Sequence, residues 1–174
     1  MQAGTFVPEV VIEHPELVAQ LHREFVHAGS DVVEAFTCYA HREKLRLIGK
    51  EHLLEEMNRQ ALAIAKEVAM ETGTLFAGDI CNTNVFVPDD SSRRAVRSMF
   101  EEQVAWAAET GVDFVIGETF QWGEEALLAL DAIKQAGLPA VVTLAMHLQG
   151  ITREGWSAAE ACKRLEDAGA EVVG

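Results

Sequence analysis

A short motif recurs along this chain, in which a small residue and a glycine precede a run of apolar residues. It is found at five places: Ala28–Val33, Thr72–Phe76, Thr110–Ile116, Ala136–Val142 and Ala168–Gly174. Each glycine stands where a helix commonly ends in a left-handed residue, and each apolar run is typical of a strand buried on both faces. Successive glycines are spaced as one strand plus one helix would require. The repeat therefore predicts an α/β fold with about five parallel strands.

Between the predicted strands, apolar residues recur every three or four positions, as they do on one face of a helix. These helical stretches are Leu17–Ala28, Leu53–Val68, Val96–Ala107, Leu127–Ile133 and Ala158–Leu165. Pro15, the Asp89–Ser92 cluster, and Ser157 with Glu160 are typical of helix starts. Alternating strands and helices form either an open doubly wound sheet or a closed barrel. No Gly-x-Gly-x-x-Gly follows a strand, which disfavours a dinucleotide-binding sheet. Five strands in 174 residues are too few for a complete eight-stranded barrel.

The net charge of the chain and the number and spacing of its cysteines disfavour several classes of protein. A formal net charge of −14 makes nucleic acid or an anionic membrane an unfavourable partner. No apolar run is long enough to span a bilayer, and no secretory signal is visible at the amino terminus. Cys38, Cys81 and Cys162 are odd in number and widely spaced, which disfavours a disulfide framework. We therefore expect a globular protein of the cytoplasm.

Catalytic side chains of both architectures gather at the carboxyl ends of the strands. The four stretches at these positions are Glu34–Tyr39, Asp79–Asn84, Gly117–Phe120 and Thr143–His147. Glu118 is the strongest candidate, because a half-desolvated carboxylate directly after Phe114–Ile116 needs a cationic partner. A substrate ammonium group would supply one, and a salt bridge to a neighbouring Lys or Arg is an equally good interpretation.

Two further candidates have a structural interpretation of at least equal weight. Tyr39 offers a ring face to a cationic ligand, or it lines the core with its hydroxyl bonded to the backbone. Cys38, Cys81 and His147 follow strands and are soft ligands of the kind that zinc prefers. No Cys-x-x-Cys or His-x-x-x-His spacing supports a metal site, so buried structural cysteines and a solvated histidine are the favoured interpretation.

The amino-terminal third of the chain resembles the betaine–homocysteine methyltransferases, within the homocysteine S-methyltransferase family. The resemblance is carried by Glu13–Val18, Gln20–Phe25, Ala28–Val32, Phe36–Ala40 and Lys44-Leu45. Further on, Gly111–Glu118 resembles the strand of that family that ends in a substrate-binding glutamate. The similarity runs from about Gly4 to Gly174, and its first block is the most specific.

This resemblance implies a TIM-type (β/α)8 barrel that transfers a methyl group from a small onium donor such as betaine to the zinc-activated thiol of L-homocysteine, giving methionine. It implies that Glu118 holds the homocysteine amino group, that Tyr39 and Phe6 line the donor pocket, and that Cys38 and Thr119 lie beside the substrates. A betaine-specific member would be expected to carry an aromatic residue at position 119. Sulfonium donors, like dimethylsulfoniopropionate or S-methylmethionine, therefore stay open.

The same resemblance indicates that residues 1–174 form one partial barrel domain, with strands two to six of the family. The first strand and the later strands with the three zinc-binding cysteines are not in this sequence, so no metal ligand is assigned here. The alternative is a non-catalytic barrel fragment that self-associates or needs a complementary chain. A homo-oligomer is left open, and a metal-independent barrel lyase is a third, weaker interpretation.

Overall fold

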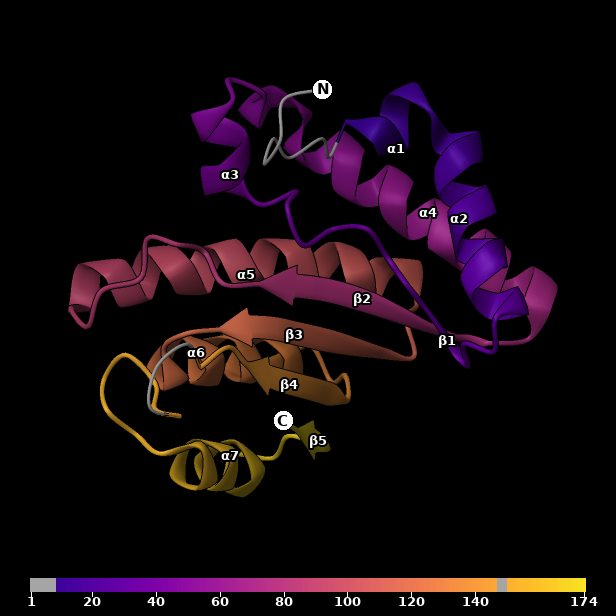
Figure 1. The fold of residues 1–174 in the computed structure, drawn as a ribbon. Helices are drawn as coiled ribbons and strands as arrows, with labels where there is room; N and C mark the ends of the chain where they lie inside the picture. Colours follow the sequence, from indigo (N-terminus) through magenta and orange to yellow (C-terminus); the bar gives the residue numbers. More distant parts are fainter. Residues whose placement is uncertain (1–8, 147–149) are drawn as a thin grey trace.

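The computed structural model describes residues 9–146 and 150–174, which form one sheet with helices packed against it (Figure 1). The strands are β1 (Val32–Glu34), β2 (Leu75–Cys81), β3 (Phe114–Phe120), β4 (Ala140–Leu144) and β5 (Val172–Val173). The sheet order is β1-β2-β3-β4-β5 and every neighbouring pair is parallel. Consecutive parallel strands lying side by side are the arrangement of a (β/α) barrel wall, which confirms the predicted fold class.

Helices connect the strands. They are α1 (Val10–Glu13), α2 (Pro15–His27), α3 (Arg42–Leu47), α4 (Leu54–Thr72), α5 (Asp90–Thr110), α6 (Gly123–Gln135) and α7 (Ala158–Asp167), with a 3₁₀ turn at Glu51–Leu53. The predicted starts are confirmed: Pro15 opens α2, Asp89 accepts a hydrogen bond from the Ser92 amide, and Ser157 accepts one from the Glu160 amide. With four and six residues, α1 and α3 are too short to have been predicted from periodicity. None of the helices in the described ranges is long and apolar enough to cross a bilayer.

The glycines of the repeat end helices as predicted. Gly73 and Gly111 follow α4 and α5 with φ of 70° and 83°, and their amides bond back to Ala69 and Ala107. In two copies of the repeat, the acidic residue two positions after the glycine accepts a hydrogen bond from the backbone of the preceding strand. Asp113 accepts a hydrogen bond from the Phe76 amide at 2.8 Å, and Glu171 accepts one from the Ala140 amide at 2.6 Å. These carboxylates tie the start of one strand to the start of its neighbour.

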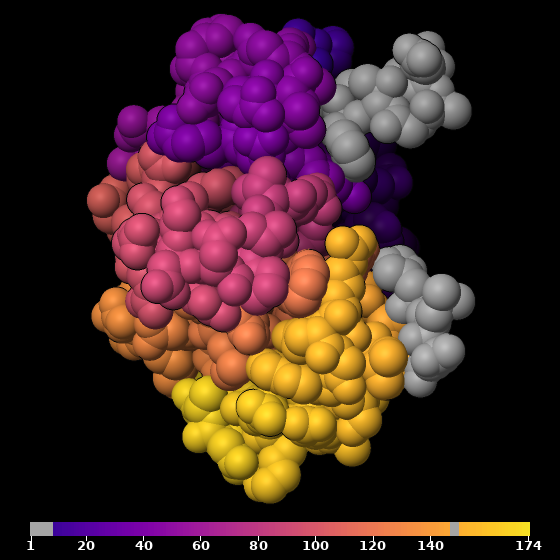
Figure 2. All heavy atoms as spheres, turned by 90° about the vertical axis from the view of Figure 1, so that its left-hand side faces the viewer, coloured from indigo at the N-terminus to yellow at the C-terminus, as the bar shows by residue number. Residues whose placement is uncertain are grey.

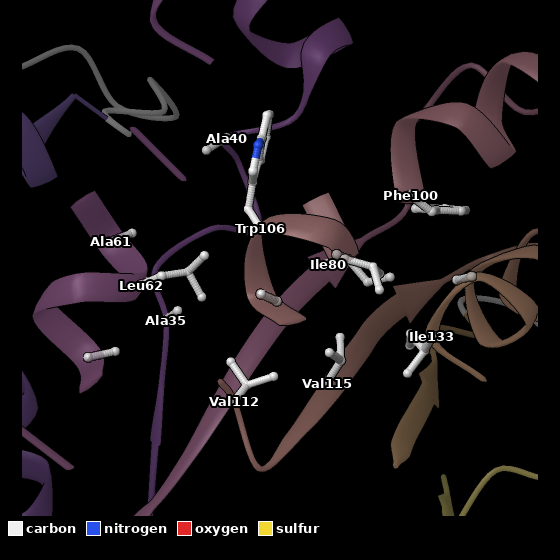
Figure 3. Packing of buried hydrophobic residues seen from close by; sticks show 14 of the residues in the cluster. Ala35, Ala40, Ala61, Leu62, Ile80, Phe100, Trp106, Val112, Val115 and Ile133 are labelled. Carbon is white, nitrogen blue, oxygen red and sulfur yellow. The ribbon is translucent and has the colours of Figure 1, made fainter. Parts of the chain in front are cut away.

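The core lies between the sheet and α4, α5 and α6, which cover the same face (Figures 1 and 3). Ile80 and Val115 point toward these helices and are 1% and 0% exposed. A Cβ on Gly78 would touch Ala107 and Val112, so position 78 faces the helices too. Side chains alternate along a strand, so the residues between them point to the opposite face, which would be the inside of a barrel.

One predicted helix face is not buried. Leu17, Leu21 and Phe25 share a face of α2 but are 53%, 52% and 61% exposed, and Val18 is the buried residue of that helix. Two strands differ from the prediction as well, since Leu75 at the start of β2 and Val172 in β5 are about half exposed. Strands buried on both faces are therefore found only in part of this sheet.

Candidate substrate-binding site

Three carboxylates lie on the inner face of the sheet, toward the carboxyl ends of three neighbouring strands. Glu34 ends β1, Asp79 lies in β2 and Glu118 in β3. Glu34 pairs with Ala77, Asp79 with Ile116, and Cys81 with Glu118, so each acid lies two residues further along the sheet than the acid on the preceding strand. The helix-facing neighbours Val33, Ile80 and Gly117 confirm that these acids point away from the helices.

Strand β3 is irregular directly after Glu118. Its pairing with β4 shifts between Gly117 and Phe120, and Thr119 has a left-handed φ of 60°. The side-chain amide of Asn82 donates to both the carbonyl oxygen and the hydroxyl of Thr119, each at 3.1 Å. The bulge returns Phe120 to the core, where it is 0% exposed, while Thr119 stays at the exposed edge beside Glu118.

The loop after β1 folds over the end of β2. The Thr37 hydroxyl donates to the Asp79 carbonyl, the Cys81 thiol donates to the Cys38 carbonyl, and the Gln103 amide donates to the Thr37 carbonyl. These bonds are buried and hold Cys38 and Tyr39 against the acids. The loop therefore closes the carboxyl end of the sheet above Asp79, which is only 7% exposed.

The electrostatics of this group are unusual because negative side chains meet without a positive one. Burial, and then the neighbouring Cys38, Glu34 and Glu118, raise the pKa of Asp79 well above its ordinary value. Burial, and then Glu118, raise the pKa of Glu34 to about 7. No ion pair in the described part of the chain includes any of the three carboxylates. Asp79 Oδ1 and Glu34 Oε1 also find no hydrogen-bond partner there.

Tyr39 stands at the same edge. Burial and then the nearby Cys38, Cys81, Glu118 and Asp79 raise the pKa of its phenol. The Lys44 ammonium lies 4.3 Å from the centroid of the Tyr39 ring, so one face of this ring already attracts a cation. The structure thus brings Glu118, Cys38, Tyr39 and Thr119 to the same edge of the sheet, and their part in substrate binding stays a prediction. Phe6, the remaining candidate, and His147 lie outside the described residues.

The zinc site implied by the resemblance needs three cysteines, and the cysteines of this chain do not form one. Cys38 and Cys81 are neighbours, whereas Cys162 is on α7, which packs against α6 and β5. A hydrogen bond to Cys81, and then burial, raise the pKa of the Cys38 thiol, which disfavours a thiolate ligand. Cys38, Asp79 and Glu118 place one potential ligand atom each within 4.8 Å of one another. This set of one thiol and two carboxylates differs from three thiolates.

A separate polar hollow lies next to Asn82. It encloses about 90 Å³, and Asn84, Gln121, Trp122 and Arg153 are among its lining residues. Figure 2 looks onto this end of the molecule, where the loop after β2 lies beside the loop between β4 and α7. None of the three clustered carboxylates lines this hollow, so we place the candidate site at the carboxylates and not at the hollow.

Two features of the site were not singled out by sequence reasoning. Glu34, Asp79 and Asn82 were named only within longer stretches at strand ends, and none of the three was given a role. The signal for Asp79 was its place one residue from Ile80, because neighbouring strand positions face opposite ways. Asn82 acts by bonding to Thr119 in the bulge of β3, and nothing in the sequence predicted that bulge.

Comparison with known proteins supports the resemblance. The sequence profile of the Homocysteine S-methyltransferase family matches residues 3–174. Betaine–homocysteine S-methyltransferase 1 of Xenopus tropicalis is 38% identical over 178 residues, covering 100% of this chain and 44% of the frog protein. S-methylmethionine–homocysteine S-methyltransferase BHMT2 of Pongo abelii is 36% identical over 174 residues, covering 100% of this chain and 46% of that protein.

A solved structure agrees on the fold. The metallated form of the homocysteine methyltransferase MmuM from Escherichia coli superposes with a TM-score of 0.80 at 15% identity, covering 99% of this chain and 67% of that one. The chain spans less than half the length of the frog and orangutan relatives. With the profile matched over nearly every residue, this chain belongs to the homocysteine S-methyltransferase family.

Proposed function

We propose that this chain forms the substrate-binding wall of a homocysteine S-methyltransferase. The complete reaction moves a methyl group from a small onium donor, such as betaine, to the thiol of L-homocysteine and gives methionine. A sulfur–carbon bond forms, the bond between the methyl group and the onium atom breaks, and the donor leaves as a neutral amine or sulfide. The thiol proton is lost to solvent. Because the chain's cysteines do not form the implied zinc site, we assign no step to a metal.

The observation that carries the proposal is Glu118 at the carboxyl edge of β3, with no cationic side chain paired to it in the described ranges. A partly buried carboxylate needs a positive partner, and the α-ammonium group of homocysteine is one. In this proposal Glu118 orients the amino acid by a charge-assisted hydrogen bond. The thiol is then held toward the centre of the barrel.

The methyl donor is proposed to lie on the side of Tyr39. Quaternary ammonium and sulfonium groups bind to the faces of aromatic rings, and the Tyr39 ring already lies under the Lys44 ammonium. The exposed Thr119 next to Glu118 adds no aromatic ring to this side. The relatives' own names include both a betaine and an S-methylmethionine enzyme, so either class of donor agrees with this site.

The test is the binding of L-homocysteine to the chain, measured by calorimetry for wild type and for Glu118→Gln. We expect the Kd to rise roughly 10- to 100-fold in the variant, because a charged hydrogen bond is lost while the shape is kept. The matched control is Glu56→Gln, which removes the same charge from an exposed position on α4. Equal affinity of wild type and Glu118→Gln would refute the proposal.

A further inference from the structure

Asp79 is the most deeply buried of the three clustered carboxylates, and one of its two carboxylate oxygens has no hydrogen-bond partner among the described residues. Its side chain accepts a hydrogen bond from the Cys38 amide, whereas Oδ1 accepts none from any described residue. An ionisable group that is 7% exposed is normally paired or fully hydrogen-bonded. This oxygen is therefore available to a hydrogen-bond donor or a cation of a ligand.

The spacing fits a single small cation. Potential ligand atoms of Asp79, Glu118 and Cys38 all lie within 4.8 Å of one another. Two carboxylate oxygens that accept hydrogen bonds from one ammonium nitrogen, each at ~2.8 Å and at a tetrahedral angle, are about 4.6 Å apart. One primary ammonium group can therefore bond to both carboxylates. An ammonium group has three N–H donors, which is more than Glu118 alone is placed to accept.

We propose that Asp79 is a second substrate-binding carboxylate, whose free Oδ1 accepts a hydrogen bond from the same ammonium group that Glu118 binds. This inference rests on the proposed function, because it takes the α-ammonium of an amino-acid thiol as the ligand. Glu34 is a third acid that interacts electrostatically with both carboxylates and increases the negative potential there. The cluster thereby selects substrates with a free amino group over thiols that carry only a carboxylate.

The raised pKa of Asp79, caused by burial and then by the neighbouring Cys38, Glu34 and Glu118, agrees with this arrangement. A buried carboxylate without a partner disfavours its charged form, and a bound ammonium reverses that preference. The chain without substrate therefore tolerates a neutral residue at position 79 better than an aspartate. A position that weakens the fold and strengthens binding is the signature of a functional residue.

The experiment is Asp79→Asn, which keeps the shape and the bond from the Cys38 amide but removes the charge. We expect a melting temperature equal to or above that of wild type, together with a Kd for L-homocysteine that is at least tenfold higher. Binding of 4-mercaptobutyrate, which lacks the amino group, should be unchanged. A merely structural aspartate would show the opposite pattern, with a lower melting temperature and equal effects on both thiols.

Other outcomes separate the alternatives. If Asp79→Asn leaves homocysteine affinity unchanged while Glu118→Gln weakens it, this inference is wrong and the proposed function stands. If neither variant changes affinity, both are wrong. A Zn²⁺ or Mg²⁺ ion that raises the melting temperature of wild type but not of Asp79→Asn would assign the cluster to a metal and overturn the inference.

A measurement on wild type covers the case of a variant that does not fold. The ¹³C resonance of the Asp79 side-chain carboxyl should shift when L-homocysteine is added and should not shift with 4-mercaptobutyrate. If the chemical shift of this carbon stays unchanged with both ligands, the inference is wrong.

Discussion

Asn82 holds Thr119 in a left-handed backbone conformation by donating two hydrogen bonds, both at 3.1 Å, to its carbonyl oxygen and its hydroxyl. A β-branched residue rarely has a positive φ, and the strain is of the order of 1–2 kcal/mol. The strained residue comes directly after Glu118, so the contact from Asn82, which follows β2, fixes the direction in which that carboxylate leaves β3.

Replacement of Asn82 by Ala should therefore disturb the site more than the fold. We expect a loss of about 1 kcal/mol in the free energy of unfolding, because two partly exposed hydrogen bonds disappear. Homocysteine affinity should fall several-fold as Glu118 loses its fixed direction. Chemical denaturation and calorimetry measure the two effects.

The control uses glycine, which adopts a positive φ without strain. In the double variant Asn82→Ala/Thr119→Gly, the backbone no longer needs Asn82 to hold it, so part of the lost affinity should return. If the double variant binds as weakly as Asn82→Ala alone, the bulge is not the means by which Asn82 acts.

Gly123 begins α6 where Trp156 of the β4–α7 loop packs against it. A Cβ at this position would lie 2.4 Å from two carbons of the indole ring, closer than van der Waals contact permits. Gly123→Ala should lower the free energy of unfolding by about 1–3 kcal/mol because the ring must move. Trp156→Ala removes the obstacle, so the double variant should be no less stable than Trp156→Ala alone; additive losses would contradict the steric explanation.

The fold was largely predictable because its signals are local. Left-handed glycines after α4 and α5, a proline at the start of α2 and caps at Asp89 and Ser157 depend on neighbours within four residues. The acidic residue of the repeat was not understood from sequence. Asp113 bonds to Phe76 and Glu171 to Ala140, partners more than thirty residues away that only the sheet register brings near.

The location of the site could be predicted from the sequence, but most of its residues and its detailed geometry could not. The rule that functional residues follow parallel strands identified Glu118 and Tyr39, and the fold brings them to one edge. It did not identify Asp79, because the stretch around it was treated as buried on both faces and the facing of each side chain was not followed. The bulge at Thr119 depends on hydrogen bonds from Asn82, thirty-seven residues earlier in the chain, which no local pattern reveals.

Glu34 should make the stability of the chain depend on pH in a defined direction. Its pKa is raised from an ordinary value of 4.5 to about 7, by burial and then by Glu118, and Asp79 is a further acidic neighbour. Between these two values the folded chain keeps a proton that the unfolded chain has lost. The free energy of unfolding therefore falls as pH rises through this window, by an amount on the order of 2 kcal/mol.

Glu34→Gln cannot ionise, so it should be more stable than wild type at pH 8 and should show a smaller fall between pH 4.5 and 7. Asp79 remains and contributes in the same direction, so some slope persists. Urea denaturation at several pH values measures this, with the exposed Glu56→Gln as the control. A variant with the full wild-type slope would show that Glu34 titrates normally in the folded chain.

The exposed face of α2 should make this chain associate when it is alone. Leu17, Leu21 and Phe25 are each more than half exposed, and in the described sheet β1 and β5 each pair on one side only. The apolar face of α2, a helix that contacts the edge strand β1, is a surface that proteins usually cover. We expect sedimentation velocity to show a weight-average mass that rises with concentration. Leu21→Lys should shift the association to higher concentration, whereas Leu47→Lys on the distant α3, where the leucine is 67% exposed, should not. A strictly monomeric wild type at all concentrations would show that this face needs no partner.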